Sequence, residues 1–260
     1  MCRLMGYLGR PLPLERLLYE PDHSLIVQSY QPREMTSGVV NADGFGVGWY
    51  HPQRDTEPFS YKTILPVWND LNLPSLSRYI ESGCMLATIR SATSGQSVDM
   101  VNCQPFQRDR ISFIHNGFIG DFRKTLYRPL RERLTDPAYQ LIHGTTDSEH
   151  IFALLLDQLT DTGSLPTALH QTIALLAELG DKYETEFSAN IIVSDGQQLV
   201  ASRFANRDPV PTLYWLSPQS PFAEAVLIAS EPLFEADWVA FGDRSLLTVN
   251  SDLSTQIISL

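Results

Sequence analysis

The sequence predicts an α+β fold built from antiparallel sheets, and three observations favour it. Segments of strand length stand on both sides of two helical segments, so the order is strands, two helices, strands rather than alternating βαβ units. Asp195-Gly196 separates two apolar segments and is typical of a β-hairpin. The glycine-rich stretch 44–48 leads into further sheet-forming residues instead of a helix, which disfavours a doubly wound nucleotide-binding fold.

In the first half of the chain the pattern predicts mostly strands. Residues 2–9 are expected to form a strand with Cys2 at its tip, and a short helix is expected after Pro13. Residues 23–36 are expected to be irregular. Glycine alternates with larger residues in 41–50, which predicts a strand that either packs closely against other backbone or approaches a ligand. Two further strands are predicted at Met85–Ile89 and Ile111–His115.

The second half opens with two predicted helices. Thr146-Asp147-Ser148-Glu149 has the form of a capping box, and apolar residues follow it at helical spacing. A second helix is predicted from Pro166 to about Leu179, ending at Gly180. Strands are then predicted at 190–193, 198–202, 213–216, 225–229 and 245–249, with an edge strand at 255–260. No repeat or linker interrupts the pattern, so residues 1–260 are expected to form a single domain.

Composition excludes several classes of protein. With 260 residues, 43% of them hydrophobic, the chain can bury a core without disulfide or metal support. The net charge of −11 argues against nonspecific binding to nucleic acid or to anionic membranes. Cys2, Cys84 and Cys103 form no C-x-x-C pair, which favours a reducing cytoplasm. No apolar run approaches the ~18 residues of a membrane-spanning helix, so a cytoplasmic location is predicted.

Cys2, which only Met1 precedes, is the first candidate catalytic residue. Removal of Met1 would leave a residue that carries both a thiol and a free α-amine. The thiolate is the reactive form of cysteine, and an α-amine, which titrates near ~8, can take up its proton. A cysteine near the amino terminus is more often incidental, so this interpretation depends on what the rest of the chain supplies.

Three further segments supply groups for cleaving a γ-glutamyl amide. Asn116 can donate its side-chain amide to a tetrahedral oxyanion, and Gly117 lets a backbone N–H approach closely. Arg90 suits a bidentate contact with the α-carboxylate of a glutamyl group. Asp147 suits the ammonium group of the same glutamyl group. Alternatively, Asp147 could cap the start of a helix. Each motif is commonplace alone, so the prediction rests on their combination.

Together these motifs resemble the class-II glutamine amidotransferases, a branch of the N-terminal-nucleophile (Ntn) hydrolases. The four motifs follow one another in the family's order. The resemblance implies a four-layer αββα sandwich with antiparallel sheets. It also implies the roles of the site residues, with Cys2 as the nucleophile, Asn116 and Gly117 as the oxyanion hole, and Arg90, Thr93 and Asp147 around the glutamyl group.

Within the family, the chain is most similar to the free-standing γ-glutamyl hydrolases of ergothioneine biosynthesis (EgtC type). The segments that carry this likeness are Met1-Cys2-Arg3, Gly6–Gly9, His23-Ser24-Leu25, Gln28-Ser29, Val40–Tyr50 and Arg90–Thr93. They imply a small-molecule substrate, γ-glutamyl-hercynylcysteine sulfoxide, with water as acceptor and no metal or organic cofactor. Three alternatives stay open: a Dug3-like glutathione-degrading hydrolase, a glutaminase subunit that feeds ammonia to a separate synthetase, and a non-catalytic partner-binding subunit.

Aromatic residues offer a candidate contact for the remainder of such a substrate. Trp49, Tyr50 or Trp68 could attract a trimethylammonium group by a cation–π interaction, which contributes ~0.5–2 kcal/mol. Trp68 is favoured because Pro66 and Asn69 indicate a loop around it, although packing in a core is the commoner role of such residues. The histidines match no metal-binding motif. Assembly is left open, with a homo-oligomer as one option.

Overall fold

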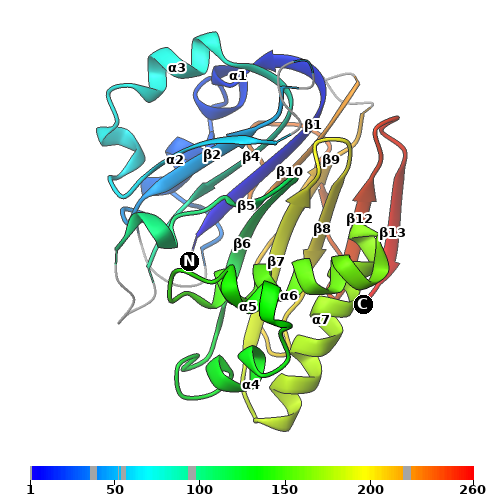
Figure 1. Cartoon of the computed structure of the whole chain (residues 1–260). Coiled ribbons are helices and arrows are strands. Elements are labelled where there is room, and N and C mark those ends of the chain that lie inside the picture. The colour runs from blue at the N-terminus through cyan, green and yellow to red at the C-terminus, as the bar shows by residue number, and fades with distance from the viewer. Residues whose placement is uncertain (1, 36–39, 52, 54–56, 93–97, 219–223) are drawn as a thin grey trace.

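The fold is a four-layer αββα sandwich. The computed structural model describes the whole chain except residues 1, 36–39, 52, 54–56, 93–97 and 219–223. In the described part, two antiparallel sheets lie face to face and helices cover the outer face of each (Figure 1). The predicted fold class is therefore confirmed.

The sheet that carries the amino terminus has the first strand of the chain at its centre. Among the described residues its strands are β1 (Arg3–Pro13), β2 (Phe45–Trp49), β3 (Phe59–Thr63), β4 (Glu81–Ile89), β9 (Tyr214–Leu216), β10 (Ala225–Ala229) and β11 (Val239–Ala240). Their order across the sheet is β11-β9-β10-β1-β4-β2-β3. Because β1 pairs with β10 on one side and β4 on the other, both edges of the strand that follows Cys2 are fixed.

The second sheet carries the Asn116-Gly117 motif. Its described strands are β5 (Phe106–Arg108), β6 (Ile111–Ile119), β7 (Phe187–Ser194), β8 (Leu199–Arg203), β12 (Ser245–Val249) and β13 (Thr255–Ser259), in the order β13-β12-β8-β7-β6-β5. The Asp195-Gly196 turn joins β7 to β8, and Gly196 has a φ of +87°, which agrees with the predicted hairpin. The predicted edge strand is β13.

Helices form the two outer layers. Against the first sheet lie α1 (Glu15–Leu18), α2 (Leu25–Tyr30) and α3 (Leu73–Tyr79), with the short 3₁₀ turns η1 (Val67–Asn69) and η2 (Met100–Asn102) in the connections. Beside the second sheet lie α4 (Tyr127–Arg131), α5 (Asp136–Gln140), α6 (Asp147–Thr162) and α7 (Leu165–Lys182). No helix in the described ranges is long and apolar enough to cross a membrane.

Strand alternation decides which side chains meet between the sheets. Successive side chains of a strand point to opposite faces. Leu4 and Leu8 of β1 join Ile114 of β6 and Ile192 of β7 in the cluster between the sheets, whereas Met5 and Tyr7 pack under α1–α3. By the same alternation Cys2 faces the second sheet.

Three local predictions were wrong. Residues 23–36 are not irregular throughout, because the Ser24 hydroxyl accepts a hydrogen bond from the Val27 amide and begins α2. Strand β6 runs on to Ile119, so His115, Asn116 and Gly117 lie inside it rather than at its end. Helix α7 passes through Gly180, since this glycine allows close approach of Asn206 and Thr185 instead of ending the helix.

The glycines of β2 serve close packing. A Cβ at Gly46 would collide with the carbonyl group of Gln104 and would lie 3.0 Å from Pro105 Cδ. At Gly48 a Cβ would lie 3.2 Å from Pro105 Cγ. Close contact with other backbone, one of the two predicted explanations, therefore accounts for this alternation.

We expect Gly46→Ala to destabilise the fold by about 1–3 kcal/mol, because the backbone at Gln104 must move to admit the methyl group. Denaturant unfolding measures the loss. Gly242→Ala is the matched control, since the nearest atom to a Cβ there is the Ser245 hydroxyl at 4.0 Å. Equal stabilities of the two variants would contradict the packing argument.

The first turn of α6 depends on a neutral histidine. Nδ1 of His150 donates to the Thr146 carbonyl at 2.7 Å, and its Nε2 accepts from Arg131 Nε at 2.9 Å. Burial, together with the Arg131 charge, lowers the pKa of His150 to about 4. An unfolded histidine titrates near ~6.5, so the unfolded chain binds the proton first as the pH falls.

The contribution of neutral His150 to the free energy of unfolding is therefore fully present above pH ~6.5 and is lost as the pH falls towards ~4. The total loss is about 3 kcal/mol at most. We expect the free energy of unfolding of the wild type to fall more steeply over this range than that of His150→Gln. Chemical denaturation at a series of pH values gives both slopes. Parallel slopes would show that His150 does not set this dependence.

Candidate active site

A small pocket at the tip of β1 contains the proposed nucleophile. The residues that line it are Cys2, Phe45, Thr88, Arg90, Cys103 and Gln104. The Cys2 side chain is partly exposed, and its thiol donates a long hydrogen bond to the Ser91 carbonyl oxygen at 3.7 Å. The structure thus brings Cys2 and Arg90 together, 88 positions apart in the sequence, because β1 and β4 pair with Arg3 opposite Ile89.

Arg90 is buried where β4 ends, and neighbouring backbone holds it. Its amide donates to the Gly44 carbonyl at 2.8 Å, and its own carbonyl accepts from the Asp43 amide at 3.1 Å. One guanidinium nitrogen, Nη1, donates to the Asp43 carbonyl at 3.4 Å. A buried guanidinium that lines the pocket beside the thiol can bind an anionic group of a substrate.

Gln104 links this pocket to the second sheet. Its side chain accepts from the His115 amide at 2.6 Å and donates to the His115 carbonyl at 3.1 Å. Asn116 is the next residue, and it points between the sheets because Ile114, two positions earlier, belongs to the inter-sheet cluster. Gln104 therefore connects the Cys2 pocket with the backbone that directly precedes Asn116.

The Asn116 side chain is fully buried, and neither its Nδ2 nor its Oδ1 has a hydrogen-bond partner among the described residues. Leaving such a group unpaired costs ~1–3 kcal/mol, and native proteins rarely keep one without a reason. A donor whose partner arrives with the substrate is such a reason. A buried amide N–H of this kind has the chemistry needed to stabilise an oxyanion.

Gly117 occupies a position that a larger residue could not. A Cβ there would collide with the carbonyl oxygen of Ser188 and with Nε2 of His115. The backbone of β6 consequently lies against both groups directly after Asn116. Packing against Ser188 and His115 thus accounts for a glycine at this position, and the approach of its amide to an oxyanion stays a prediction.

Asp147 lies at the first turn of α6 and is tied to β6. Its carboxylate accepts from the Ile119 amide and from the Ser148 amide, both at 2.8 Å. The helix cap itself is Thr146, whose hydroxyl accepts from the Glu149 amide. Asp147 is buried, its Oδ1 also lies 3.4 Å from the Ser148 hydroxyl, and its Oδ2 keeps a further lone pair that can accept from an ammonium group.

His115 joins the start of α6 to β6 and β7. Its Nε2 lies 3.1 Å from the Ser188 carbonyl and therefore donates, so Nδ1 accepts from the Ser148 hydroxyl at 2.8 Å. Burial lowers the pKa of His115, which keeps this neutral tautomer. The segment around Asp147 is thereby held in register with Asn116 and Gly117.

Of the predicted site residues, Cys2 and Arg90 line this pocket, whereas Asn116, Gly117, Asp147 and Trp68 are not among its lining residues. Thr93 lies outside the described residues. Trp68 belongs to η1, is 42% exposed, and packs edge-on against Tyr30 of α2 with ring centroids 6.1 Å apart. The pocket that contains Cys2 is lined by other residues, so Trp68 is placed at the outer surface. Trp49 packs against Phe59, and the Tyr50 hydroxyl contacts two backbone carbonyls.

Sequence reasoning missed Gln104 and Asn190. Asn190 pairs with Asn116 across β6 and β7, and it points to the same face. Its Nδ2 donates to the carbonyls of Pro211 and Thr212, which leaves Oδ1 buried without a partner among the described residues. A polar residue in the apolar run 190–193 was the available signal for Asn190; Gln104 has none, because its role depends on a tertiary contact.

Comparison with known proteins agrees with this geometry. The family model described as "Glutamine amidotransferases class-II" matches residues 18–247. A probable glutamine amidotransferase DUG3 of Saccharomyces cerevisiae is 33% identical, over 96% of this chain and 82% of the relative. A γ-glutamyl-hercynylcysteine sulfoxide hydrolase of Mycolicibacterium smegmatis is 30% identical, over 96% of both chains.

Solved structures extend the likeness to the fold. A glutamine aminotransferase class-II domain protein from Silicibacter pomeroyi superposes with a TM-score of 0.72 at 27% identity, covering 99% of this chain and 98% of the other. The prediction of an amide-cleaving enzyme is confirmed at the level of the family. The chain belongs to the class-II glutamine amidotransferases.

Proposed function

We propose that this chain is an N-terminal-cysteine amidohydrolase that cleaves a γ-glutamyl amide through a thioester intermediate. The proposal rests on the buried, unpaired amide of Asn116 and on Gln104, which lines the Cys2 pocket and binds the backbone of His115, the residue before Asn116. Acyl transfer to a thiol requires a hydrogen-bond donor that is free to bind the oxyanion, since the oxyanion forms only after attack.

The cycle begins with removal of Met1, which frees the α-amine of Cys2. The amine takes the thiol proton, directly or through one water, and the sulfur attacks the γ-carbonyl carbon. Asn116 Nδ2 and the Gly117 amide donate to the oxyanion. The amine then protonates the leaving nitrogen, the C–N bond breaks, and water hydrolyses the Cys2 thioester to release glutamate.

The glutamyl group is proposed to lie between Arg90 and Asp147. Arg90 lines the pocket and contacts the α-carboxylate, while Asp147 accepts from the α-ammonium. Thr93 is proposed to assist Arg90. Trp68 stays a candidate for the far end of a long substrate, where its exposed ring could meet a trimethylammonium group.

For the leaving group we propose hercynylcysteine sulfoxide, as in the name of the 30% identical relatives. The relative named DUG3 favours two alternatives, a glutathione-degrading hydrolase and a glutaminase subunit. Water is the proposed acceptor both for the release of hercynylcysteine sulfoxide and for the glutathione-degrading alternative. The three free cysteines suit a reducing cytoplasm, which is the proposed location.

A substrate panel tests the proposal. Purified protein should release glutamate from γ-glutamyl-hercynylcysteine sulfoxide at a higher kcat/KM than from glutathione or glutamine, and Cys2→Ala should abolish all turnover. Intact mass should show that Met1 is absent. Preference for glutamine would favour the ammonia-supplying alternative, and an active Cys2→Ala would end the mechanism.

Asn116→Ala should lower kcat by about 10²–10³ while KM changes little, because the lost donor acts only on the oxyanion. Steady-state kinetics on a γ-glutamyl substrate measure both constants, and circular dichroism verifies the fold. A rise in KM at constant kcat would instead assign Asn116 to ground-state binding.

Arg90→Lys should raise KM by about tenfold or more, since a point charge replaces a planar pair of donors and each charge-assisted bond contributes ~1.5–3 kcal/mol. The same assay provides the value, and Arg110→Lys, far from the Cys2 pocket, is the matched control. An unchanged KM would place the carboxylate contact elsewhere.

A further inference from the structure

A buried positive charge stands directly behind the nucleophile. Arg3 follows Cys2 in the chain and is fully buried on the opposite face of β1. Its Nε forms an ion pair with Glu231 at 3.4 Å, whereas Nη1 and Nη2 have no hydrogen-bond partner among the described residues. Burial lowers the pKa of Arg3 and the charge of Glu231 opposes this, but a guanidinium still stays protonated in a protein.

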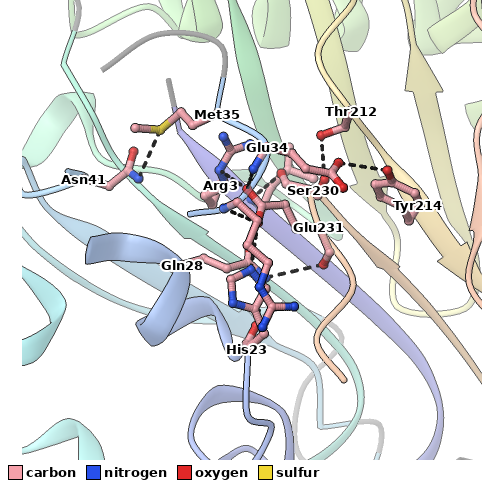
Figure 2. A network of polar contacts seen from close by, with 12 residues as sticks. Arg3, His23, Gln28, Glu34, Met35, Asn41, Thr212, Tyr214, Ser230 and Glu231 are labelled. Atoms are coloured by element: carbon pink, nitrogen blue, oxygen red, sulfur yellow. Dashed lines mark hydrogen bonds and ion pairs between the residues drawn. The ribbon is translucent and has the colours of Figure 1, made fainter. Parts of the chain in front are cut away.

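Glu231 binds several of the groups that surround Arg3. Its carboxylate contacts Nε2 of His23 at 2.7 Å and accepts from the amides of Arg33 at 2.9 Å and Glu34 at 3.0 Å. Burial alone raises the pKa of the Glu231 carboxyl, but these hydrogen bonds and the Arg3 charge outweigh it and lower that pKa. Figure 2 shows Arg3, His23 and Glu231 at the centre of one polar network.

Ser230, the residue before Glu231, binds the backbone of Leu4, the residue that follows Arg3 in β1. The Leu4 amide donates to the Ser230 hydroxyl and the Ser230 amide donates to the Leu4 carbonyl, both at 3.0 Å. Thr212 donates to the Ser230 carbonyl at 3.0 Å, and the Thr212 carbonyl accepts from Asn190. The pair Ser230-Glu231 thus fixes both residues that follow Cys2 and connects them with the second sheet.

We propose that Arg3, held by Glu231, is a positioning residue that fixes the tip of β1 and places a positive charge behind the Cys2 thiolate. The inference rests on the proposed role of Cys2 as nucleophile. Arg3 directly follows Cys2, and the two side chains point to opposite faces of the strand, so the buried guanidinium lies behind the thiol. A neighbouring cation favours the thiolate, and the low dielectric of the interior strengthens this effect.

The α-amine of Cys2 is the ionisable group nearest to its thiol once Met1 is removed, and the described residues supply others on both faces of the strand. Behind the strand lie Glu231, His23, Glu34 and Tyr214, the last of which donates to Glu34 at 2.8 Å. On the pocket side the ionisable neighbours are Arg90, Cys103, Lys62 and Asp43. Removing the charge of Arg3 or of Glu231 therefore changes the potential at the thiol in opposite directions.

Alkylation by iodoacetamide tests this without any substrate. The rate at the Cys2 peptide is followed by mass spectrometry over a pH series, which separates Cys2 from the buried Cys84 and Cys103. Arg3→Met should move the midpoint of the pH–rate profile up by ~0.5–1 unit, and Glu231→Gln should move it down. Arg3→Lys, which keeps the charge, should stay within a few tenths of the wild type.

Glu178→Gln is the matched control, because it removes the same charge from an exposed ion pair with Arg133 on α7 and should move nothing. If Glu231→Gln does not fold, Glu34→Gln should give a smaller shift in the same direction. Variants that lose thermal stability but keep the wild-type midpoint would overturn the proposal. Failure of the wild type to cleave γ-glutamyl amides, with the opposite shifts preserved, would reject the proposed function alone.

Discussion

The site depends on the close packing of the two sheets. Along the middle of the sandwich the facing side chains are apolar, as with Leu4 against Ile114 and Ile192, and a Cβ at Gly6 would lie only 3.0 Å from Ile192. Interiors packed at this density allow little adjustment, so the separation of the sheets is set. Cys2 stands at the tip of the central strand of the first sheet, and Asn116 lies two positions after Ile114 on the inner face of the second sheet.

On the inner face of the second sheet, two asparagines keep unpaired polar atoms. The side chains of Asn116 and Asn190 share one face of the second sheet, and each has at least one buried polar atom without a partner among the described residues. Neighbouring groups are instead fully engaged, as with Gln104 on the His115 backbone. Rigid surroundings that hold an unpaired donor are the condition for electrostatic stabilisation without reorganisation.

The sequence predicted those features that depend on local chemistry. The helix start at Thr146, the Asp195-Gly196 hairpin and the strand after Cys2 were confirmed because each follows from residues a few positions apart. The capping box itself is only half formed, since the Glu149 carboxylate binds the amides of His143 and Gly144. Features that depend on tertiary contact were not predictable. Gly180 resembles a helix end until Asn206 packs against it, and Glu231 lies 228 positions from Arg3 in a segment with no motif of its own.

The central claim is that the sulfur of an N-terminal Cys2 carries the glutamyl group during turnover. Acid quenching of the enzyme during reaction with a γ-glutamyl substrate, followed by peptide mass spectrometry, tests it most directly. The account predicts a glutamyl thioester on a peptide that begins with Cys2 and has no Met1, and its accumulation in Asn116→Ala should be reduced. A glutamyl adduct on Cys103, or turnover by a chain that still begins with Met1, would contradict it.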